Sequence, residues 1–319
     1  MSSTLSPETA RELSSYGYKG DRRDGGLYQT TKEIDLALKI ALTSGRPLLV
    51  TGRSGVGKSM LANYAATTIQ YKLLPPYVVT SRSDAQDLLW RFDAVSRLAA
   101  AQMKHPNAYR EDLFVEPGHL WWAFAPASAR EQQDRYRTAK QLGKEAGSGS
   151  TASRVGEAPE KPAVLLIDEI DKADPEFPNA LLVPLGSGCF NVPPLGDREI
   201  KREDTTTPLV IITSNNERPL PPAFLRRCVT LALEQPDEQR MKKIAEQHFP
   251  DAKNLAREVV AKMYKGWEAK KGQEAENQAK PPSPPEILDM IAACDALSTG
   301  PGKPGFDELV KIVHGSSLS

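Results

Sequence analysis

One eight-residue segment constrains the fold of this chain more than any other. The segment 52–59, GRSGVGKS, fits the pattern G-x-x-x-x-G-K-[S/T]. It directly follows the aliphatic run 47–50, PLLV, and directly precedes residues at helical spacing that begin at Leu61. In such a segment the glycines let backbone N–H groups approach phosphate oxygens, and the following helix adds the positive end of its dipole. The segment therefore predicts a phosphate-binding loop between a strand and a helix.

The side chains of this loop predict a nucleotide bound together with a magnesium ion. Lys58 is expected to reach the β- and γ-phosphates, and the Ser59 hydroxyl to bind Mg²⁺. The plain alternative is a glycine-rich turn with an incidental lysine. The predicted nucleotide-binding positions are Gly52, Ser54, Gly55, Val56, Gly57, Lys58, Ser59 and Met60.

Three further aliphatic runs predict strands that are buried on both faces. They are 77–80, 164–167 and 209–212, and continuous runs of this kind are typical of a parallel sheet covered by helices. Segments at helical spacing, 61–68 and 88–98, lie between them. The alternation predicts an α/β fold, with the parallel sheet of a P-loop NTPase flanked by helices.

The periodicity changes along the chain and divides it into parts. Residues 1–25 are polar, and 26–235 carry the strand and helix patterns of the α/β core. A Gly/Ser/Ala-rich stretch at about 142–162 predicts a flexible insertion. Residues 236–319 hold four helical repeats of apolar residues and no strand-like run, which predicts a small all-helical lid domain.

Charge and cysteine content exclude several classes of protein. Lys+Arg 41 balances Asp+Glu 41, so no global positive field attracts nucleic acid or an anionic membrane. No aliphatic run approaches the length of a membrane span. Three widely spaced cysteines fit a reducing compartment. We therefore expect a soluble, cytoplasmic protein without a membrane partner, and these features argue against nucleic acid as a partner.

The aliphatic run 164–167 ends in two adjacent carboxylates, Asp168 and Glu169. In phosphate-loop enzymes the strand beside the loop ends in an aspartate that holds Mg²⁺. A glutamate directly after it can deprotonate the attacking water. The pair is a weak signal alone, because strands often end in acidic turns, but it follows a good phosphate loop. We predict that Asp168 binds the metal and that Glu169 is the general base.

Two later segments extend this pattern. The run 209–212 leads into Asn215, and the segment 220–228, LPPAFLRRC, predicts a short helical turn bearing Arg226 and Arg227. The sequence here resembles the MoxR-like branch of the AAA+ ATPases, from about Gly26 to Leu233 and on into the helical lid. The resemblance is carried by the ordered blocks GRPLLVTGRSGVGKSMLA, SRSDAQDLLWRFDAVSRL, GHLWWAF, VLLIDEIDKADPEFPNALL and PLVIITSNNERPLPPAFLRRC.

The resemblance implies roles for three of these residues. Asn215 stands where the family has the sensor 1 residue, which positions the lytic water. Arg227, with Arg226 beside it, is the residue most like the family's arginine finger, which reaches the nucleotide of a neighbouring subunit. The resemblance thus implies a homo-oligomer, usually a hexameric ring, and such a cation contributes about 10³–10⁵ in rate. The plain alternative is that both arginines form surface salt bridges.

Two less regular segments also resemble features of the family. Residues 99–135 look like its insertion around helix 2, with Trp121 and Trp122 on a strand or hairpin that contacts a partner. The alternative is that one tryptophan belongs to the core and the other covers an edge. Residues 190–193 and 198–201 resemble the arms of a hairpin that would point toward a ring's pore or a bound partner.

One departure from the family concerns the lid. The family often has an arginine, sensor 2, at the start of the third lid helix, and Pro285 occupies that position within 280–286, KPPSPPE. Either Lys280 replaces the arginine as a point charge, or the lid responds weakly to the γ-phosphate.

The leading hypothesis is an Mg²⁺-dependent ATPase whose ring remodels a protein partner, in the manner of a chaperone. The alternative is an ATP-gated signalling or assembly switch with slow hydrolysis, in a bacterial stress or defence system. A helicase is disfavoured by the charge balance, and adenine over guanine follows from the resemblance alone. The segment 171–174, DKAD, resembles a guanine-reading motif but has the wrong first residue, and we expect it to cap the next helix.

Overall fold

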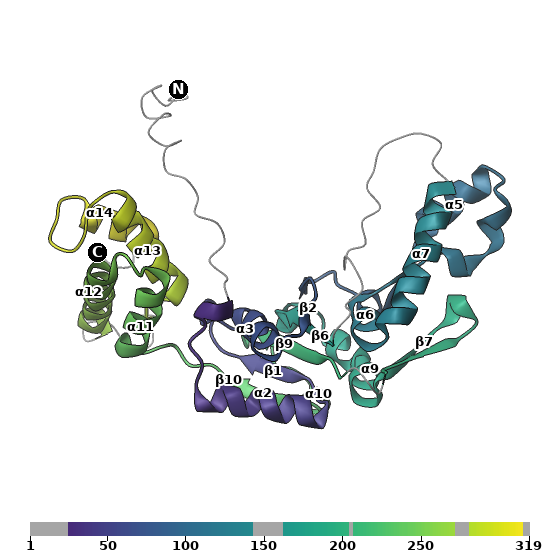
Figure 1. Cartoon of the computed structure of the whole chain (residues 1–319), viewed down its shortest axis with the longest axis horizontal. Coiled ribbons are helices and arrows are strands. Elements are labelled where there is room, and N and C mark those ends of the chain that lie inside the picture. Colours follow the sequence, from purple (N-terminus) through teal and green to yellow (C-terminus); the bar gives the residue numbers. More distant parts are fainter. Residues whose placement is uncertain (1–24, 143–161, 204–206, 272–280, 315–319) are drawn as a thin grey trace, which may run out of the picture. The chain divides into compact units, whose positions relative to one another are not determined.

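The computed structural model describes residues 25–142, 162–203, 207–271 and 281–314 (Figure 1). The described residues form two compact units. The α/β unit comprises those of 30–53 and 57–234, and the helical unit those of 1–29, 54–56 and 235–319. Most of the predicted polar N-terminal segment, residues 143–161 of the predicted insertion, and Lys280 lie outside the described residues.

A six-stranded parallel sheet forms the centre of the α/β unit. The strand order is β10-β1-β9-β6-β2, and β3 also pairs with β6. The continuous aliphatic runs become strands because helices cover both faces, which confirms the predicted fold class. The strand predicted at 77–80 is shorter than expected, covering two residues. The strands are β1 Leu48–Thr51, β2 Lys72–Leu73, β3 Tyr77–Val78, β6 Ala163–Asp168, β9 Leu209–Ser214 and β10 Val229–Ala232.

The register of the three central strands aligns their carboxyl ends. Thr51 of β1 lies opposite Ser214 of β9, and Ile167 of β6 lies opposite Ile212 of β9. The residues that follow these strands are therefore brought to one edge of the sheet, which we call the carboxyl edge.

Local sequence signals begin and end the two helices next to β1. Thr31 caps α2, Lys32–Ser44, by accepting a hydrogen bond from the backbone N–H of Ile34 at 3.3 Å. Gly45 ends that helix with a φ of 64°. The helix α2 packs along β10 (Figure 1), and α3, Met60–Ile69, starts directly after the glycine-rich loop.

The segment after β3 differs from the prediction of one helix over 88–98. It forms α4, Gln86–Leu89, then β4, Trp90–Phe92, then α5, Ala94–Gln102. Antiparallel pairing of β4 with β5, Val115–Pro117, overrides the helical period. The 3₁₀ turns η2, Pro106–Tyr109, and η3, Glu111–Phe114, follow α5, and α7, Pro126–Leu142, ends the segment.

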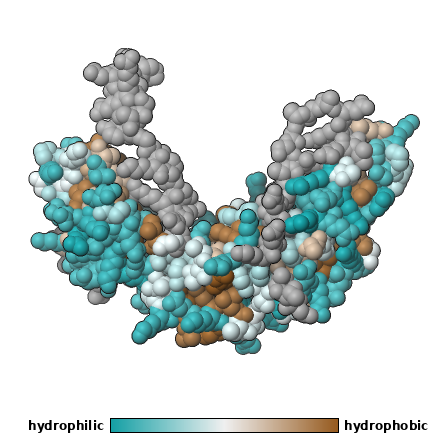
Figure 2. All heavy atoms as spheres, in the orientation of Figure 1, coloured by the Kyte–Doolittle hydropathy of each residue, from teal (hydrophilic) through white to brown (hydrophobic). Residues whose placement is uncertain are grey.

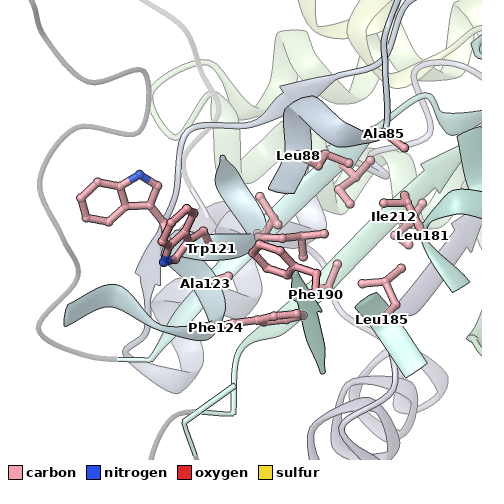
Figure 3. Packing of buried hydrophobic residues seen from close by; sticks show 14 of the residues in the cluster. Ala85, Leu88, Trp121, Ala123, Phe124, Leu181, Leu185, Phe190 and Ile212 are labelled. Carbon is pink, nitrogen blue, oxygen red and sulfur yellow. The ribbon is translucent and has the colours of Figure 1, made fainter. Parts of the chain in front are cut away.

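The prediction that Trp121 and Trp122 lie on a strand or hairpin is wrong. Both belong to helix α6, His119–Phe124, and both are buried, with 0% and 2% of their surface exposed. Trp121 packs edge-on against Phe190, with ring centroids 6.1 Å apart (Figure 3). These tryptophans belong to the core and are not available to contact a partner.

The predicted hairpin is confirmed. Strand β7, Cys189–Val192, pairs antiparallel with β8, Arg198–Lys201. The turn between them contains η5, Pro193–Leu195, and its residues Gly196 and Asp197 are exposed. Between β6 and this hairpin lie η4 Ile170–Lys172, α8 Glu176–Ala180 and α9 Leu182–Ser187.

The helical unit contains the four helices that the apolar spacing predicts. Asp237 caps α11 by accepting from the N–H of Arg240 at 2.7 Å, and Ser283 with Glu286 forms a capping box on α13. No helix within the described ranges is long and apolar enough to cross a membrane. The helices are α11 Glu238–His248, α12 Lys253–Lys271, α13 Pro284–Ala296 and α14 Phe306–His314, and the short 3₁₀ turn η1 covers Gly25–Leu27.

Candidate nucleotide site

The glycine-rich loop has a backbone that side-chain-bearing residues rarely adopt. Gly52 has a φ of 150° and Gly57 a φ of 98°, and these positive values favour glycine. The loop leads directly from β1 into the first turn of α3, which starts at Met60. The amino end of α3 therefore lies at the carboxyl edge, where the positive end of the helix dipole favours a phosphate.

Lys58 is buried at this edge and uses all three donors of its ammonium group. Its Nζ donates to the carbonyl oxygens of Gly52 and Arg53, each at 2.8 Å, and to Oδ1 of Asn215 at 2.7 Å. Burial lowers the pKa of Lys58, and the carboxylate of Asp168 opposes this shift. Lys58 thus links the loop to the end of β9.

Ser59 and Asp168 form a pair of oxygen ligands. The Ser59 hydroxyl donates to both carboxylate oxygens of Asp168, at 2.9 and 3.0 Å. Thr213 holds the same carboxylate, since its hydroxyl donates to Oδ1 of Asp168 at 2.5 Å. No cluster of three potential metal ligands from His, Cys, Asp and Glu occurs in the described part of the chain. A hydroxyl and one carboxylate fit Mg²⁺, which keeps waters and phosphate oxygens as its other ligands.

Glu169 follows Asp168 in a strained backbone conformation. Its φ is 61°, in the left-handed region that a glutamate rarely occupies. Its backbone N–H donates to Oγ1 of Thr213 at 2.8 Å. Its carboxylate accepts from Nδ2 of Asn215 at 3.3 Å and from Nζ of Lys172 at 2.6 Å. The hydrogen bond from Lys172 to Glu169 raises the pKa of Lys172.

Asp171 does not cap the next helix as predicted. It lies in η4 and is 2% exposed, and its Oδ2 accepts from the backbone N–H groups of Asn215 at 3.0 Å and Glu217 at 2.8 Å. The helix α8 that follows has no side-chain cap at its start. The carboxylate instead holds the loop after β9, because it accepts from two backbone N–H groups of that loop.

Three residues of this network escaped sequence reasoning: Thr213, Asp171 and Lys172. Thr213 had a usable signal in the sequence, since it is a polar residue directly after an aliphatic run. In the structure its side chain is fully buried. Lys172 lies three residues after its partner Glu169, a local spacing that could have indicated the pair. Asp171 had no such signal, because no spacing rule connects it to a residue 44 positions away.

The sheet does not bring the two predicted arginines to this network. Arg226 and Arg227 follow α10, Pro222–Leu225, and precede β10, so they lie at the opposite, amino edge of the sheet. Both are exposed, and Nη1 of Arg227 donates to the carbonyl of Ala223 at 3.2 Å. Within the described residues neither arginine pairs with a carboxylate. The surface salt bridges of the alternative interpretation are therefore not seen there.

Comparisons with known proteins place this geometry in a family. A search of curated proteins found no match. Among solved structures, the Thermotoga maritima RuvB Holliday junction branch migration motor is similar at 14% identity, with a TM-score of 0.43, over 89% of this chain and 67% of that one. A variant of that motor gives a TM-score of 0.44 at 14% identity, over 89% of this chain and 68% of that one. The family model described as the AAA domain of the dynein-related subfamily matches residues 47–228, more than half of the chain, and the chain therefore belongs to this AAA+ family.

Proposed function

We propose that this chain binds ATP together with Mg²⁺ and hydrolyses it to ADP and phosphate. The observation that carries the proposal is one connected network of polar side chains at the carboxyl edge. Parallel α/β sheets bind ligands in the crevice outside the carboxyl ends of their strands. The network consists of Lys58, Ser59, Asp168, Glu169 and Asn215, with Thr213 and Lys172 bonded to it.

Phosphate binding is expected to rearrange the partners of Lys58. Its three present acceptors are two backbone carbonyls and the side-chain amide of Asn215. A charged phosphate oxygen is a stronger acceptor than any of these. The Asn215 side chain is the partner that moves most easily, so nucleotide binding is proposed to release it from Lys58.

Ser59 and Asp168 are proposed to hold Mg²⁺, with Thr213 keeping the Asp168 carboxylate in place. The ion bridges phosphate oxygens and neutralises the charge that develops on them. The backbone of Gly52, Ser54, Gly55, Val56, Gly57 and Met60 is proposed to complete the phosphate site, by family resemblance.

Glu169 is proposed to act as the general base. A water oxygen forms the new bond to the γ-phosphorus, the bond from the β–γ bridging oxygen to that phosphorus breaks, and the Glu169 carboxylate takes the proton of the water. Asn215 donates to the same carboxylate at 3.3 Å, which supports a role in positioning that water. A general base of this kind contributes about 10²–10⁴ in rate.

Arg227 is proposed to act on the nucleotide of a neighbouring protomer, with Arg226 beside it. The strand β10 separates these arginines from the carboxyl edge by four residues, about 13 Å at 3.3 Å per residue. An arginine side chain does not span that distance, so neither residue reaches the γ-phosphate of its own chain. A finger that works only between subunits requires a homo-oligomer, which we propose to be a ring of six.

The surface of α2 supports such an interface. Leu36 and Ile40, one helical turn apart, are 58% and 43% exposed, and Figure 2 shows hydrophobic surface over this helix. Leu225, just before the arginine pair, is 38% exposed. Exposed apolar groups gathered in this way mark interaction surfaces.

We further propose a ring of the MoxR type that remodels a protein partner, in the cytoplasm. The exposed tip of the β7–β8 hairpin is the feature that supports contact with a partner. The alternative is a switch with slow hydrolysis. Pro285 favours it, because this residue in the first turn of α13 has no cation to offer a γ-phosphate.

The test is ATP hydrolysis per protomer, measured against protein concentration with Mg²⁺ present. A steep rise in specific activity is expected, because the site is completed between subunits. Adding Arg227→Ala protomers to the active assembly is expected to poison it. Arg91→Ala protomers, which lose an exposed arginine of β4, are the matched control and should not.

Two outcomes would count against parts of the proposal. If the chain binds ATP but hydrolyses none at any protein concentration, it is a nucleotide-binding protein and not an ATPase. A rate that neither rises with concentration nor falls on adding Arg227→Ala protomers would show that each chain hydrolyses ATP alone.

A further inference from the structure

We propose that Arg46 is the positioning residue of the arginine pair: it holds the segment 226–228 in the conformation that presents Arg227 to a neighbouring protomer. The inference rests on the proposed function, since it requires Arg227 to act between subunits. It assigns a role to a residue that lies at the amino edge of the sheet, away from the phosphate loop.

The guanidinium group of Arg46 binds three consecutive backbone carbonyls. Its Nη2 donates to the carbonyls of Arg226 at 2.6 Å and Cys228 at 2.8 Å, and its Nε donates to the carbonyl of Arg227 at 3.2 Å. These carbonyls follow the short helix α10, where terminal carbonyls have no partner within the helix. One side chain thus binds every carbonyl of the segment that carries both arginines.

The N–H groups of the same segment are also bound, but by α10 itself. The N–H groups of Arg226, Arg227 and Cys228 donate to the carbonyls of Pro222, Phe224 and Leu225, at 3.0 to 3.1 Å. Cys228 is 4% exposed, and burial raises the pKa of its thiol to about 12. The N–H groups of the segment are therefore held by α10, and Arg46 is the side chain that binds its carbonyls among the described residues.

Arg46 is itself fixed by the sheet. It lies between Gly45, which ends α2, and Pro47, and the residue before a proline is restricted to extended conformations. The carbonyl of Pro47 accepts from the N–H of Val229 at 2.8 Å, where β10 begins to pair with β1. The side chain that binds the segment 226–228 thus starts two residues before β1, the strand that leads to the phosphate loop.

Arginine is the residue type that this geometry needs. Its planar group has five donors in a rigid fork, and two of its nitrogens reach carbonyls of three successive residues. A lysine has a single nitrogen on a flexible stem, so it is expected to hold this segment less well. Removal of Arg46 is expected to let Arg226 and Arg227 move, and a misplacement of about 1 Å can cost about 10²-fold in rate.

The test is a complementation assay with protomers mixed before assembly. Arg46→Met alone is expected to lower kcat about ten- to a hundredfold, with KM for ATP within about threefold. Mixing it with Glu169→Gln protomers, which keep an intact arginine pair but lack the base, is expected to restore hydrolysis. The Arg46→Met sites then receive an intact finger from their neighbours.

Two controls separate this inference from the proposed function. The pair Arg227→Ala with Glu169→Gln tests the finger itself, and failure of that pair to recover activity would overturn the proposed function. Recovery of that pair without recovery of the Arg46→Met pair would overturn only the role of Arg46. Arg202→Met is the matched control, because Arg202 and Arg46 line one small hollow. Arg202 donates to the carbonyl of Gly45, at 3.4 Å, and not to the segment 226–228.

A double variant keeps the proposal testable if Arg46→Met folds poorly. Arg46→Lys in the Arg227→Ala background is expected to cause no further loss, because the finger that Arg46 positions is already absent. Alone, Arg46→Lys should lower kcat and be rescued by Glu169→Gln protomers. An equal further loss in both backgrounds would show that Arg46 acts only on stability, and would overturn the proposal.

Discussion

The two edges of the central sheet hold their charged groups in different ways. At the carboxyl edge, Lys58 and Glu169 are both bonded to the side chain of Asn215, so their partners change when one side chain rotates. At the amino edge, Arg46 is bonded to three successive backbone carbonyls, and main-chain groups do not change partners by the rotation of one side chain.

This difference indicates what each edge can do. A side-chain network can exchange partners when a phosphate arrives, because rotamer changes are small and fast. A cation on main-chain carbonyls keeps its geometry unless the strands move. We infer that the carboxyl edge is arranged to change during the reaction cycle and that the amino edge is arranged to stay constant.

The largest expected effect comes from removing the base at the changing edge. Glu169→Gln keeps the shape of the side chain but accepts no proton, so ATP hydrolysis should fall by about 10²–10⁴. ATP binding, measured by fluorescence or calorimetry, should remain. Glu176→Gln, at an exposed glutamate of α8, is the matched control. Undiminished turnover in Glu169→Gln would remove the catalytic assignment.

A smaller effect is expected at the residue that holds Asn215. Asp171→Ala leaves the N–H groups of Asn215 and Glu217 without their acceptor, and the displaced amide should lower kcat by up to about 10²-fold. Asp171→Asn keeps an acceptor oxygen and should recover most of the rate. Asp174→Ala, at an exposed aspartate nearby, should change little. An equal loss in the alanine and asparagine variants would show that the negative charge matters, rather than the position of Asn215.

The strands and the phosphate loop could be predicted because their signals are local. A continuous aliphatic run has few alternatives to a strand covered on both faces, and the spacing of Gly52, Gly57 and Lys58 is itself the motif. The hairpin arms at 190–193 and 198–201 were expected from the family resemblance, and the structure forms the hairpin with its first strand one residue earlier.

The errors arise where partners lie far apart in the sequence. The pairing of Trp90–Phe92 with Val115–Pro117 breaks a helical period that looked continuous from Leu88 to Leu98. Asp171 was expected to cap a helix beside it, but its partners follow a strand 44 residues later. Local propensity cannot compete with such contacts, because its contribution is a few tenths of a kcal/mol per residue.

Thr213, which donates to the proposed metal ligand Asp168, allows a stability test of the carboxyl edge. Thr213→Val keeps the volume but removes the donor to Asp168 and the acceptor of the Glu169 N–H, both in buried surroundings. The free energy of unfolding should fall by about 1–3 kcal/mol, and more Mg²⁺ should be needed for half-maximal hydrolysis. Thr230→Val, at an exposed position of β10, should stay within about 0.5 kcal/mol. Equal unfolding free energies for wild type and Thr213→Val in denaturant would contradict this role.

The smallest expected effect is on the pH dependence of the free energy of unfolding. This measurement compares Lys58 at the carboxyl edge with Arg46 at the amino edge. Burial lowers the pKa of Lys58 in the folded chain below its ordinary value of 10.5, so the unfolded chain binds more protons in the window between the two pKa values. The free energy of unfolding therefore rises with pH through that window, up to about 10.5. The stability of wild type relative to Lys58→Met should increase from neutral pH toward 10.5, measured by urea unfolding. Relative to Arg46→Met it should stay flat, because an arginine keeps its charge over this range. A flat Lys58 difference would mean that the carboxylates around Lys58 offset its burial, and that the two edges hold their cations at equal cost.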